Sequence, residues 1–283
     1  MLFASTELVA RIERAECSLL TDGAASTGRR HPNIEVFTRE ISGGVATHAG
    51  PDSPLNKVAG LGFDGSVDEA ELEAIEQIFH HRDTPVQVEL SCLADPGIGG
   101  MLSDRGYRLV GFENVLGCPL TPDRQAPSTP DIEIVATADD DLAAWVDVVV
   151  TGFATPDTEG VASPEEFPRE ALERVLGDMA SSTGFSRYLA RRGGEIAGGG
   201  SLRQSEGIAQ LCGASTLPAH RRRGVQTALL HTRLALAAQS GCDLAIMTTL
   251  PGSRSQKNAQ RRGFQLLYTR AILQRSPGGD RTL

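Results

Sequence analysis

The chain has 283 residues, which is longer than one average domain and shorter than three, so its length favours two domains of ordinary size. With 40% hydrophobic and 22% charged residues, its composition excludes a disordered chain and an integral membrane protein. The apolar stretches are much shorter than the roughly 20 residues that a spanning helix needs. Acidic residues interrupt the first stretch, Met1–Leu20, so we expect no secretory signal.

The cysteines are odd in number and widely spaced, and no two of them form a CxxC pair: Cys17, Cys92, Cys118, Cys212 and Cys242. Disulfide frameworks and zinc sites both need paired spacings. The sequence therefore predicts reduced thiols, no metal and a cytoplasmic protein.

The formal net charge of −9 is distributed unevenly. Residues 1–130 contain 10 Lys and Arg against 19 Asp and Glu, and residues 131–219 contain 6 against 15. Residues 220–283 contain 11 basic residues against 2 acidic ones. A local basic segment in an acidic chain indicates either one site for a polyanion or an ordinary solvated basic face.

Four prolines in the twelve residues Pro119–Pro130 cannot continue a helix or a central strand, so this stretch is predicted to be a linker. We therefore expect a first domain over residues 1–120, a linker over 121–130, a second domain over 131–276 and a flexible tail over 277–283.

Hydrophobic periodicity and cap residues predict the elements that follow the linker. Ser163-Pro164-Glu165 is typical of a helix start, and Gly193-Gly194 is typical of a tight hairpin. In chain order the elements are a strand at Asp131–Val135, a helix from Asp139 through Val149, a helix from Ser163 to about Met179, strands at Ser186–Arg191, Ile196–Arg203 and Ile208–Thr216, a helix at Val225–Gln239, a strand at Asp243–Thr249, a helix at Ser253–Arg262 and a strand at Phe264–Leu273.

The first half contains a fainter version of the end of this order. Strands are predicted at Ile34–Arg39, Val45–Ala49, Val58–Phe63, Val86–Leu93 and Arg108–Leu116, with a helix at Val67–Phe79. The segment Asp104–Val110 (DRGYRLV) parallels Arg261–Leu267 (RRGFQLL), which is a weak internal repeat and suggests duplication.

The most informative segment runs from Thr216 to Leu230, where a strand leads into an arginine-rich turn and then a long helix. Gly224 lets a ligand approach the backbone, and the helix start presents unpaired N–H groups and the positive end of its dipole. Arg221–Arg223 add positive charge. These features favour a pyrophosphate site over an ordinary turn with exposed arginines, and the Walker P-loop pattern is absent from the sequence.

The run Pro218-x-x-Arg221-Arg222-Arg223-Gly224-Val225 resembles the (Q/R)xxGx(G/A) signature of the GCN5-related N-acetyltransferases, the GNAT superfamily. The resemblance spans about Asp131 to Arg275 and includes the Gly263-Phe264 pair before the last strand. It implies an α/β (α+β) fold of two tandem GNAT-like domains, each a mixed, mostly antiparallel sheet flanked by helices. It also implies that acetyl-CoA, the acyl donor, is held by Ser215, Thr216, Leu217, Arg221, Arg222, Arg223, Gly224, Val225, Gln226, Thr227, Ser255 and Asn258.

The sequence departs from the family pattern in both halves. Gln226 replaces the small residue that ends the signature, while Gly252 and Ala259 stand where many members carry an asparagine and a catalytic tyrosine. In the first half, the run Gly62–Ser66 precedes the helix without an arginine. We therefore expect the first half to be a degenerate GNAT-like copy that binds no cofactor.

The resemblance implies that a substrate amine attacks the thioester directly in a ternary complex. The amine must lose its proton, but the central strand Ile208–Thr216 contains no acid, so Glu206 in the preceding turn is the candidate base. Tyr268 is the candidate general acid for the leaving thiolate. Each also fits a structural role, Glu206 as an exposed turn residue and Tyr268 as a core aromatic. Cys212 fits a buried structural thiol better than a nucleophile.

The acidic remainder of the chain favours a cationic acceptor, which we expect to be a small-molecule or peptide amine. We expect a monomer or homodimer with no nucleic-acid or membrane partner, because aromatic residues that would stack on bases are scarce. The alternative is a protein that binds or senses acyl-CoA without turning it over, because the family's tyrosine and a strand acid are missing. Nucleic-acid binding through the basic C-terminal segment is a weaker alternative.

Overall fold

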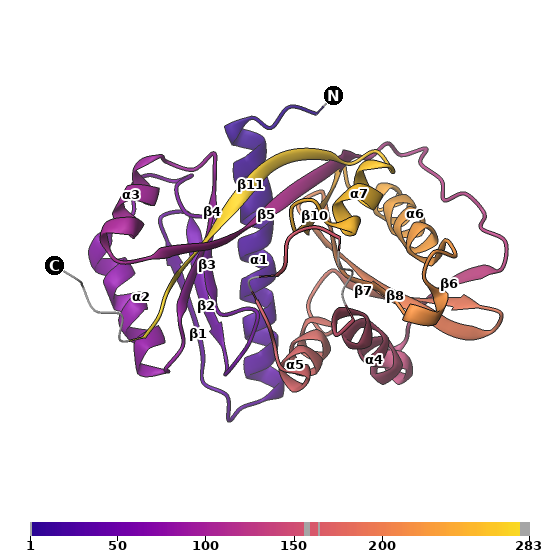
Figure 1. Ribbon diagram of the computed structural model, residues 1–283, viewed down its shortest axis with the longest axis horizontal. Coiled ribbons are helices and arrows are strands. Elements are labelled where there is room, and N and C mark those ends of the chain that lie inside the picture. Colours follow the sequence, from indigo (N-terminus) through magenta and orange to yellow (C-terminus); the bar gives the residue numbers. More distant parts are fainter. Residues whose placement is uncertain (1, 156–158, 164, 278–283) are drawn as a thin grey trace.

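The computed structural model describes residues 2–155, 159–163 and 165–277, and its strands form one sheet of eleven strands (Figure 1). Their order is β1-β2-β3-β4-β11-β5-β10-β9-β8-β7-β6. The pairs β3–β4 and β9–β10 are parallel, and the other neighbours are antiparallel. The strands are β1 (Val36–Ile41), β2 (Gly44–Ala49), β3 (Lys57–Ala59), β4 (Val86–Ser91), β5 (Arg108–Pro119), β6 (Ile132–Ala136), β7 (Phe185–Arg192), β8 (Glu195–Ser205), β9 (Ile208–Thr216), β10 (Leu244–Thr249) and β11 (Gln265–Arg275).

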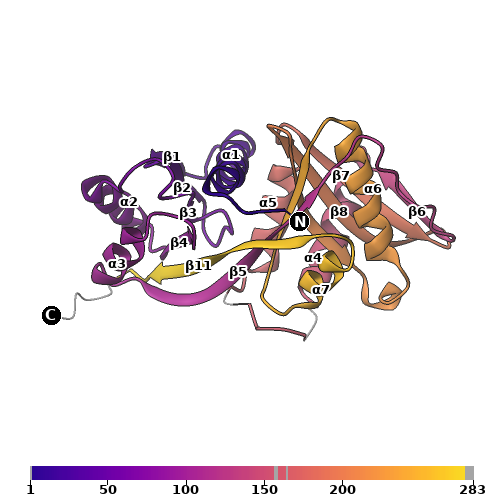
Figure 2. The same cartoon turned by 90° about the horizontal axis from the view of Figure 1, so that it is seen from above.

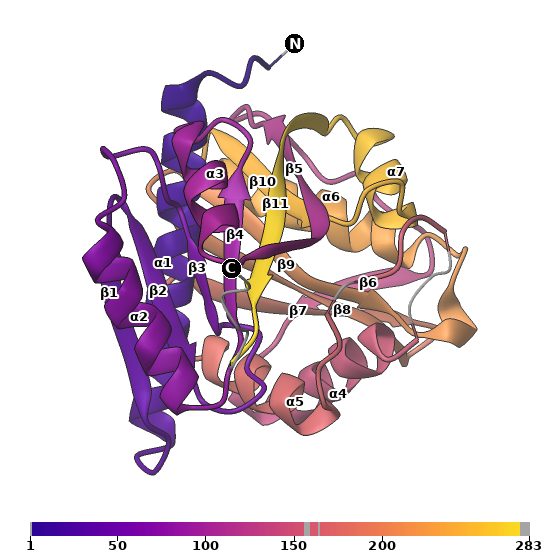
Figure 3. The same cartoon turned by 60° about the vertical axis from the view of Figure 1, so that its left-hand side comes forward.

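Helices cover both faces of this sheet. In the first half, α2 and α3 bury their apolar sides on one face, and α1 packs on the other face (Figure 3). In the second half, α6 packs on one face and α4 on the other. The helices are α1 (Thr6–Arg30), α2 (Glu69–His81), α3 (Gly97–Asp104), α4 (Leu142–Phe153), α5 (Arg169–Met179), α6 (Val225–Gln239) and α7 (Arg254–Gln260), with short 3₁₀ turns at Asp139–Asp141 and Pro218–His220.

The two halves exchange strands at the middle of the sheet. The last strand of the chain, β11, pairs with β4 of the first half along one edge and with β5 along the other. In turn, β5 pairs with β10 of the second half. These two long strands bridge the molecule in Figure 2. The sheet is therefore continuous across the two halves. The division of the chain into two domains at residues 121–130 stays a prediction.

The first helix also joins the halves. Ser5 caps α1 by accepting a hydrogen bond from the Leu8 N–H, and Arg29 and Arg30 lie in its last turn, where they complement the dipole. Leu20 and Ala24 of α1 share one buried cluster with residues of α5. A helix of the first half thus packs directly against a helix of the second.

The fold class and the order of elements in the second half follow the prediction, and the boundaries differ locally. Helix α5 begins at Arg169 and not at Ser163, because the Ser163 hydroxyl accepts a hydrogen bond from the Glu165 N–H in a local turn; Pro164 lies outside the described residues. In the first half, α1 was not predicted, and β3 ends at Ala59. The predicted tail lies outside the described residues from position 278 onward.

All five cysteines are free. Within residues 2–155, 159–163 and 165–277, no helix combines the length and the apolarity needed to cross a bilayer.

Candidate functional site

The sheet of the second half opens between its two parallel strands. The β9–β10 ladder contains three residue pairs and ends at Ile246–Gln210, although β9 continues to Thr216 and β10 to Thr249. Beyond that pair the facing edges of the two strands have no ladder partner among the described residues. Main-chain N–H and C=O groups there remain available to a ligand that enters the gap.

A bulge in β9 shapes one side of this gap. The β8–β9 register shifts so that Ser201 opposes Cys212 while Gly199 opposes Ser215, and Gly213 adopts a φ of +55°. The Ser215 hydroxyl donates to the Val148 carbonyl of α4 at 2.8 Å, so this side chain anchors the strand to the helix. At Ser215, only the main chain is left for a ligand.

The turn between β9 and α6 exposes the start of the helix. Gly224 is the N-cap residue of α6 with a φ of +85°, and Arg222 also adopts a positive φ of +61°. No side chain caps the helix. The backbone N–H groups from Arg222 to Thr227 donate no hydrogen bond to any residue that the structure describes. Free N–H groups at the positive end of a helix dipole are suited to bind an anion.

A cavity of about 680 Å³ extends from this turn along the end of β9 to α7. Ten of the twelve predicted cofactor residues line it: Ser215, Thr216, Arg221, Arg222, Gly224, Val225, Gln226, Thr227, Ser255 and Asn258. The other two, Leu217 and Arg223, do not. Leu217 instead packs against the buried cluster around Trp145 of α4, and the Arg223 side chain is exposed to solvent.

The cavity wall is strongly basic. Among the described residues, it includes one carboxylate, that of Glu159, and six basic side chains: Arg221, Arg222, Arg254, Lys257, Arg261 and Arg262. The Lys257 ammonium and the Arg254 guanidinium pair with Glu159 at 2.7 and 3.3 Å, and these bonds lower the pKa of that carboxyl. The charge left over is positive, which suits a polyanionic ligand.

Arg221 has a structural contact that the sequence did not indicate. Its guanidinium donates to the carbonyl of Thr216 at 3.3 Å and to the hydroxyl of Thr155 at 3.0 Å. It therefore joins the end of β9 to the segment after α4. Two buried polar atoms of cavity-lining residues, Thr216 Oγ1 and His220 Nδ1, have no hydrogen-bond partner among the described residues. A polar ligand in the cavity would satisfy such groups.

Neither predicted catalytic residue lines this cavity. Tyr268 is buried, and its hydroxyl donates to Glu13 of α1; burial and the Glu13 charge raise the pKa of Tyr268 well above its usual range. Glu206 lies in the exposed β8–β9 turn, at the end of β9 opposite to Thr216, and its carbonyl accepts from Arg11. Tyr268 holds a helix in place, and Glu206 lies at the far end of the strand from the gap.

Helix α7 and the turn after it contribute more residues to the cavity wall than the sequence predicts. Ser255 and Asn258 were predicted, but Arg254, Lys257 and Arg261 also line the cavity. The signal was present as the basic excess of residues 220–283. Among the described residues, no group of three or more His, Cys, Asp or Glu side chains is arranged to hold a metal ion.

Comparisons with known proteins support the fold class. Residues 134–264 match the model of the acetyltransferase (GNAT) family. No curated protein matches the chain. A GCN5-related N-acetyltransferase from Kribbella flavida has 20% sequence identity and a TM-score of 0.66, with 95% of this chain and 96% of that chain covered. A tandem GNAT protein from the clavulanic acid biosynthesis pathway has 14% identity and a TM-score of 0.58, with 84% and 79% covered. A GCN5-related N-acetyltransferase from Sphaerobacter thermophilus has 18% identity and a TM-score of 0.55, with 74% and 66% covered.

Proposed function

We propose, because residues 134–264 match the model of the acetyltransferase (GNAT) family, that the chain transfers an acetyl group from acetyl-CoA to the amine of a small molecule or peptide in a ternary complex. The observation that carries this proposal is the uncapped start of α6, which opens into a basic cavity of about 680 Å³. That volume lies within the range of about 300–1,000 Å³ that is usual for ligand pockets.

The residues around the cavity fit the parts of coenzyme A. Backbone N–H groups from Arg222 to Thr227 suit the diphosphate, and Arg254 of α7 with Arg261 and Arg262 of the turn after it suit a further phosphate. The free main-chain groups of β9 beyond Gln210 suit the amides of the pantetheine arm. When bound, acetyl-CoA supplies an activated thioester.

Positioning accounts for most of what these residues contribute. The bulge at Gly213 turns main-chain groups of β9 toward the gap, where an N–H group can polarise the carbonyl under attack. An amine held beside that carbonyl gains the advantage of an intramolecular reaction. The amine nitrogen would bond to the carbonyl carbon and lose a proton, the carbon–sulfur bond would break, and the released thiolate would take up that proton.

The second candidate is a protein that binds or senses acyl-CoA without catalysis. It is favoured by one specific observation, the absence of Tyr268 and Glu206 from the cavity wall. A cytoplasmic location, a monomeric or homodimeric state, and the absence of a nucleic-acid or membrane partner stay predictions.

The two candidates are separated by one pair of measurements on the full chain. Coenzyme A should raise the thermal unfolding midpoint under both. Only the enzyme should release free thiol from acetyl-CoA in the presence of an amine panel, such as spermidine, a lysine-containing tripeptide and an arylamine. Stabilisation without thiol release would favour the binding protein, and the absence of stabilisation would reject both.

A further inference from the structure

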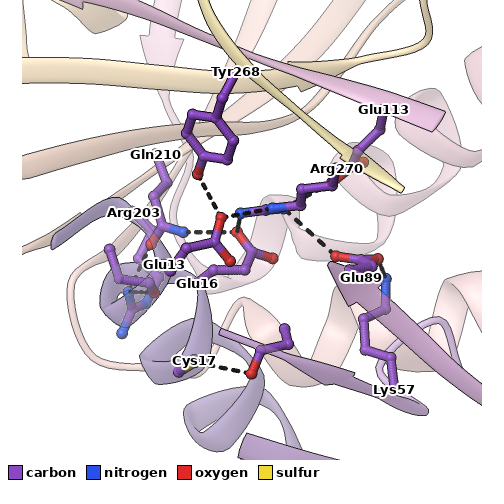
Figure 4. Close-up of polar contacts among 12 residues, drawn as sticks. Glu13, Glu16, Cys17, Lys57, Glu89, Glu113, Arg203, Gln210, Tyr268 and Arg270 are labelled. Carbon is purple, nitrogen blue, oxygen red and sulfur yellow. Dashed lines mark hydrogen bonds and ion pairs between the residues drawn. The ribbon is translucent and has the colours of Figure 1, made fainter. Parts of the chain in front are cut away.

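A buried cluster of charges lies where the two halves meet (Figure 4). At its centre is Arg270 of β11, which is 1% exposed. Its guanidinium lies 2.9 Å from Glu13, 2.7 Å from Glu113, 3.5 Å from Glu89 and 3.9 Å from Glu16. Lys57 pairs with Glu89. Four carboxylates thus surround two cations, so this cluster has an excess of negative charge when all its members are ionised.

One member of the cluster, Glu16, lies beside the gap between β9 and β10. The Gln210 side chain accepts a hydrogen bond from Arg203 at 2.7 Å and donates its Nε2 to Glu16 at 3.4 Å (Figure 4). Gln210 belongs to the last residue pair before β9 and β10 separate. The Glu16 carboxylate is therefore held at the point where the gap begins, on the face of the sheet that α1 covers.

That face of the sheet opens next to Glu16. On β10, Ile246 is buried in the cluster that α1 packs against, but Thr248, two residues further on, is exposed. Exposure within the charge cluster follows the same direction: the side chains of Glu16 and Glu113 are 15% and 19% exposed, whereas that of Glu13 is 2% exposed. The carboxylates of Glu16 and Glu113 are therefore partly exposed, whereas that of Glu13 is buried.

The cluster also contains polar atoms whose bonding is incomplete. Arg270 Nη2, which faces Glu16, and Glu13 Oε2 are buried and have no hydrogen-bond partner among the described residues. Buried donors and acceptors are normally paired. Of the two, Glu13 Oε2 is an acceptor and suits a ligand that donates hydrogen bonds.

We propose that Glu16, which the first half supplies, binds the ammonium group of the acceptor and takes its proton, while Glu113 shares the binding of that charge. The proposal rests on the proposed function and names the base that β9 itself lacks. The proton passes from the ammonium nitrogen to a Glu16 oxygen, and the freed lone pair forms the new bond to the carbonyl carbon. The first half thus completes the active site of the second.

The surroundings of Glu16 adapt it to this role. Burial, above all, raises the pKa of Glu16, and it raises that of Glu113 to about 7. A carboxylate with a raised pKa is a stronger base at neutral pH. The charged and titratable groups that act on it or are affected by it are Glu13 and Cys17 on α1, Lys57 on β3, Glu89 on β4, Glu113 on β5, Cys212 on β9 and Arg270 on β11.

The test compares the full-length wild type with Glu16→Gln, using Glu7→Gln as a control because Glu7 is an exposed carboxylate on the same helix. With spermidine or the tripeptide as acceptor, Glu16→Gln should lower kcat/KM about 100-fold or more, and Glu7→Gln should leave it unchanged. With the arylamine, which is unprotonated at neutral pH, the decrease of kcat/KM in Glu16→Gln should be much smaller. With spermidine as acceptor, kcat/KM of the wild type should rise with pH as Glu16 loses its proton, and this rise should be absent in Glu16→Gln.

A binding measurement gives a readout apart from turnover. By calorimetry, spermidine should bind the wild type loaded with free coenzyme A and bind Glu16→Gln at least 10-fold more weakly. Coenzyme A should stabilise both proteins equally. If Glu16→Gln fails to fold, Glu16→Asp keeps the charge but shortens its reach, and the same loss of kcat/KM is expected.

The two proposals fail in different ways. If the wild type acetylates no amine, the proposed function fails and this inference fails with it. If the wild type acetylates spermidine or the tripeptide and Glu16→Gln does so at an equal rate, only the inference is overturned.

Discussion

The two halves begin their corresponding helices in opposite ways. In the second half, α6 starts at Gly224 with no side-chain cap, no acid in its first turn, and arginines immediately before it. In the first half, α2 starts at Asp68, whose carboxylate accepts hydrogen bonds from the N–H groups of Ala70 and Glu71 at 2.9 and 3.3 Å. The position that is left for an external anion in one half is occupied by the chain's own carboxylate in the other.

The starts of α2 and α6 differ although the order of elements around them is similar, so a similar order of elements does not imply a similar binding site. A helix start binds an anion only when its N–H groups are free and its neighbours are not acidic. The first half meets neither condition at α2, because Asp68 uses the N–H groups and Glu69 and Glu71 add negative charge. What the first half contributes instead is charge and surface at the junction, through α1 and β5.

The largest expected effect comes from breaking the junction itself. Arg270→Met removes the cation that three carboxylates of the first half contact within 3.5 Å, and loss of one partner of a buried ion pair costs about 3–5 kcal/mol. Chemical denaturation should show this loss in the free energy of unfolding. Arg14→Met, at an exposed position on α1, should change it by less than about 0.5 kcal/mol. Equal stability of the two variants would mean that the halves fold independently of this cluster.

The next effect sharpens the contrast between the two helix starts. Gly224→Asp places a carboxylate next to the anion site, and Gly224→Asn introduces a similar strain at a φ of +85° without the charge. Coenzyme A at 100 times its Kd should stabilise the wild type by about 2.7 kcal/mol, and a 100-fold loss of affinity in Gly224→Asp reduces this to about 0.4 kcal/mol. Gly224→Asn should keep most of the stabilisation. If the two variants lose it equally, charge is not the reason that α6 binds phosphate.

Local signals were sufficient to predict the elements of the second half. The hairpin at Gly193-Gly194 and the bounds of β9 and α6 follow from turn residues and periodicity, which act within a few residues. Helix α1 could not be recognised in the same way, because Glu13 interrupts its apolar side. That carboxylate is acceptable in the interior only because Arg270, 257 positions further along the chain, pairs with it.

In the candidate site as well, local sequence signals predict some residues, and contacts between distant parts of the chain determine the others. Ten of the predicted cofactor residues line the cavity because a strand, a turn and a helix that are adjacent in sequence build most of it. Glu206 and Tyr268 do not line the cavity. Glu206 was predicted as the acid nearest to the central strand in sequence and Tyr268 as a tyrosine of the last strand, and the strand exchange that places β11 between β4 and β5 leaves no local signal. Glu16 of the first half contacts Gln210 at the end of the β9–β10 ladder, and no spacing rule connects these two residues.

A smaller effect is expected from pH, and it tests the charge that the first half brings to the junction. Burial raises the pKa of Glu113 from 4.5 to about 7, so the folded protein holds a proton there that the unfolded chain releases. This contribution to stability is complete below about pH 4.5 and is lost as the pH rises through about 7. Glu113→Gln removes it, so the melting temperature of the variant relative to the wild type should rise between pH 5 and 8. A constant difference across that range would contradict the assignment.

The smallest effect concerns the helix start of the first half. Asp68→Ala removes the cap of α2 and should cost about 1 kcal/mol in the free energy of unfolding, whereas Asp68→Asn keeps an acceptor and should cost less. Neither variant should change the stabilisation by coenzyme A, because the arginines that accompany the free N–H groups of α6 are missing at α2. Thermal unfolding with and without coenzyme A measures both quantities. If Asp68→Ala weakened the response to coenzyme A, the first half would take part in nucleotide binding and the contrast between the two helix starts would be wrong.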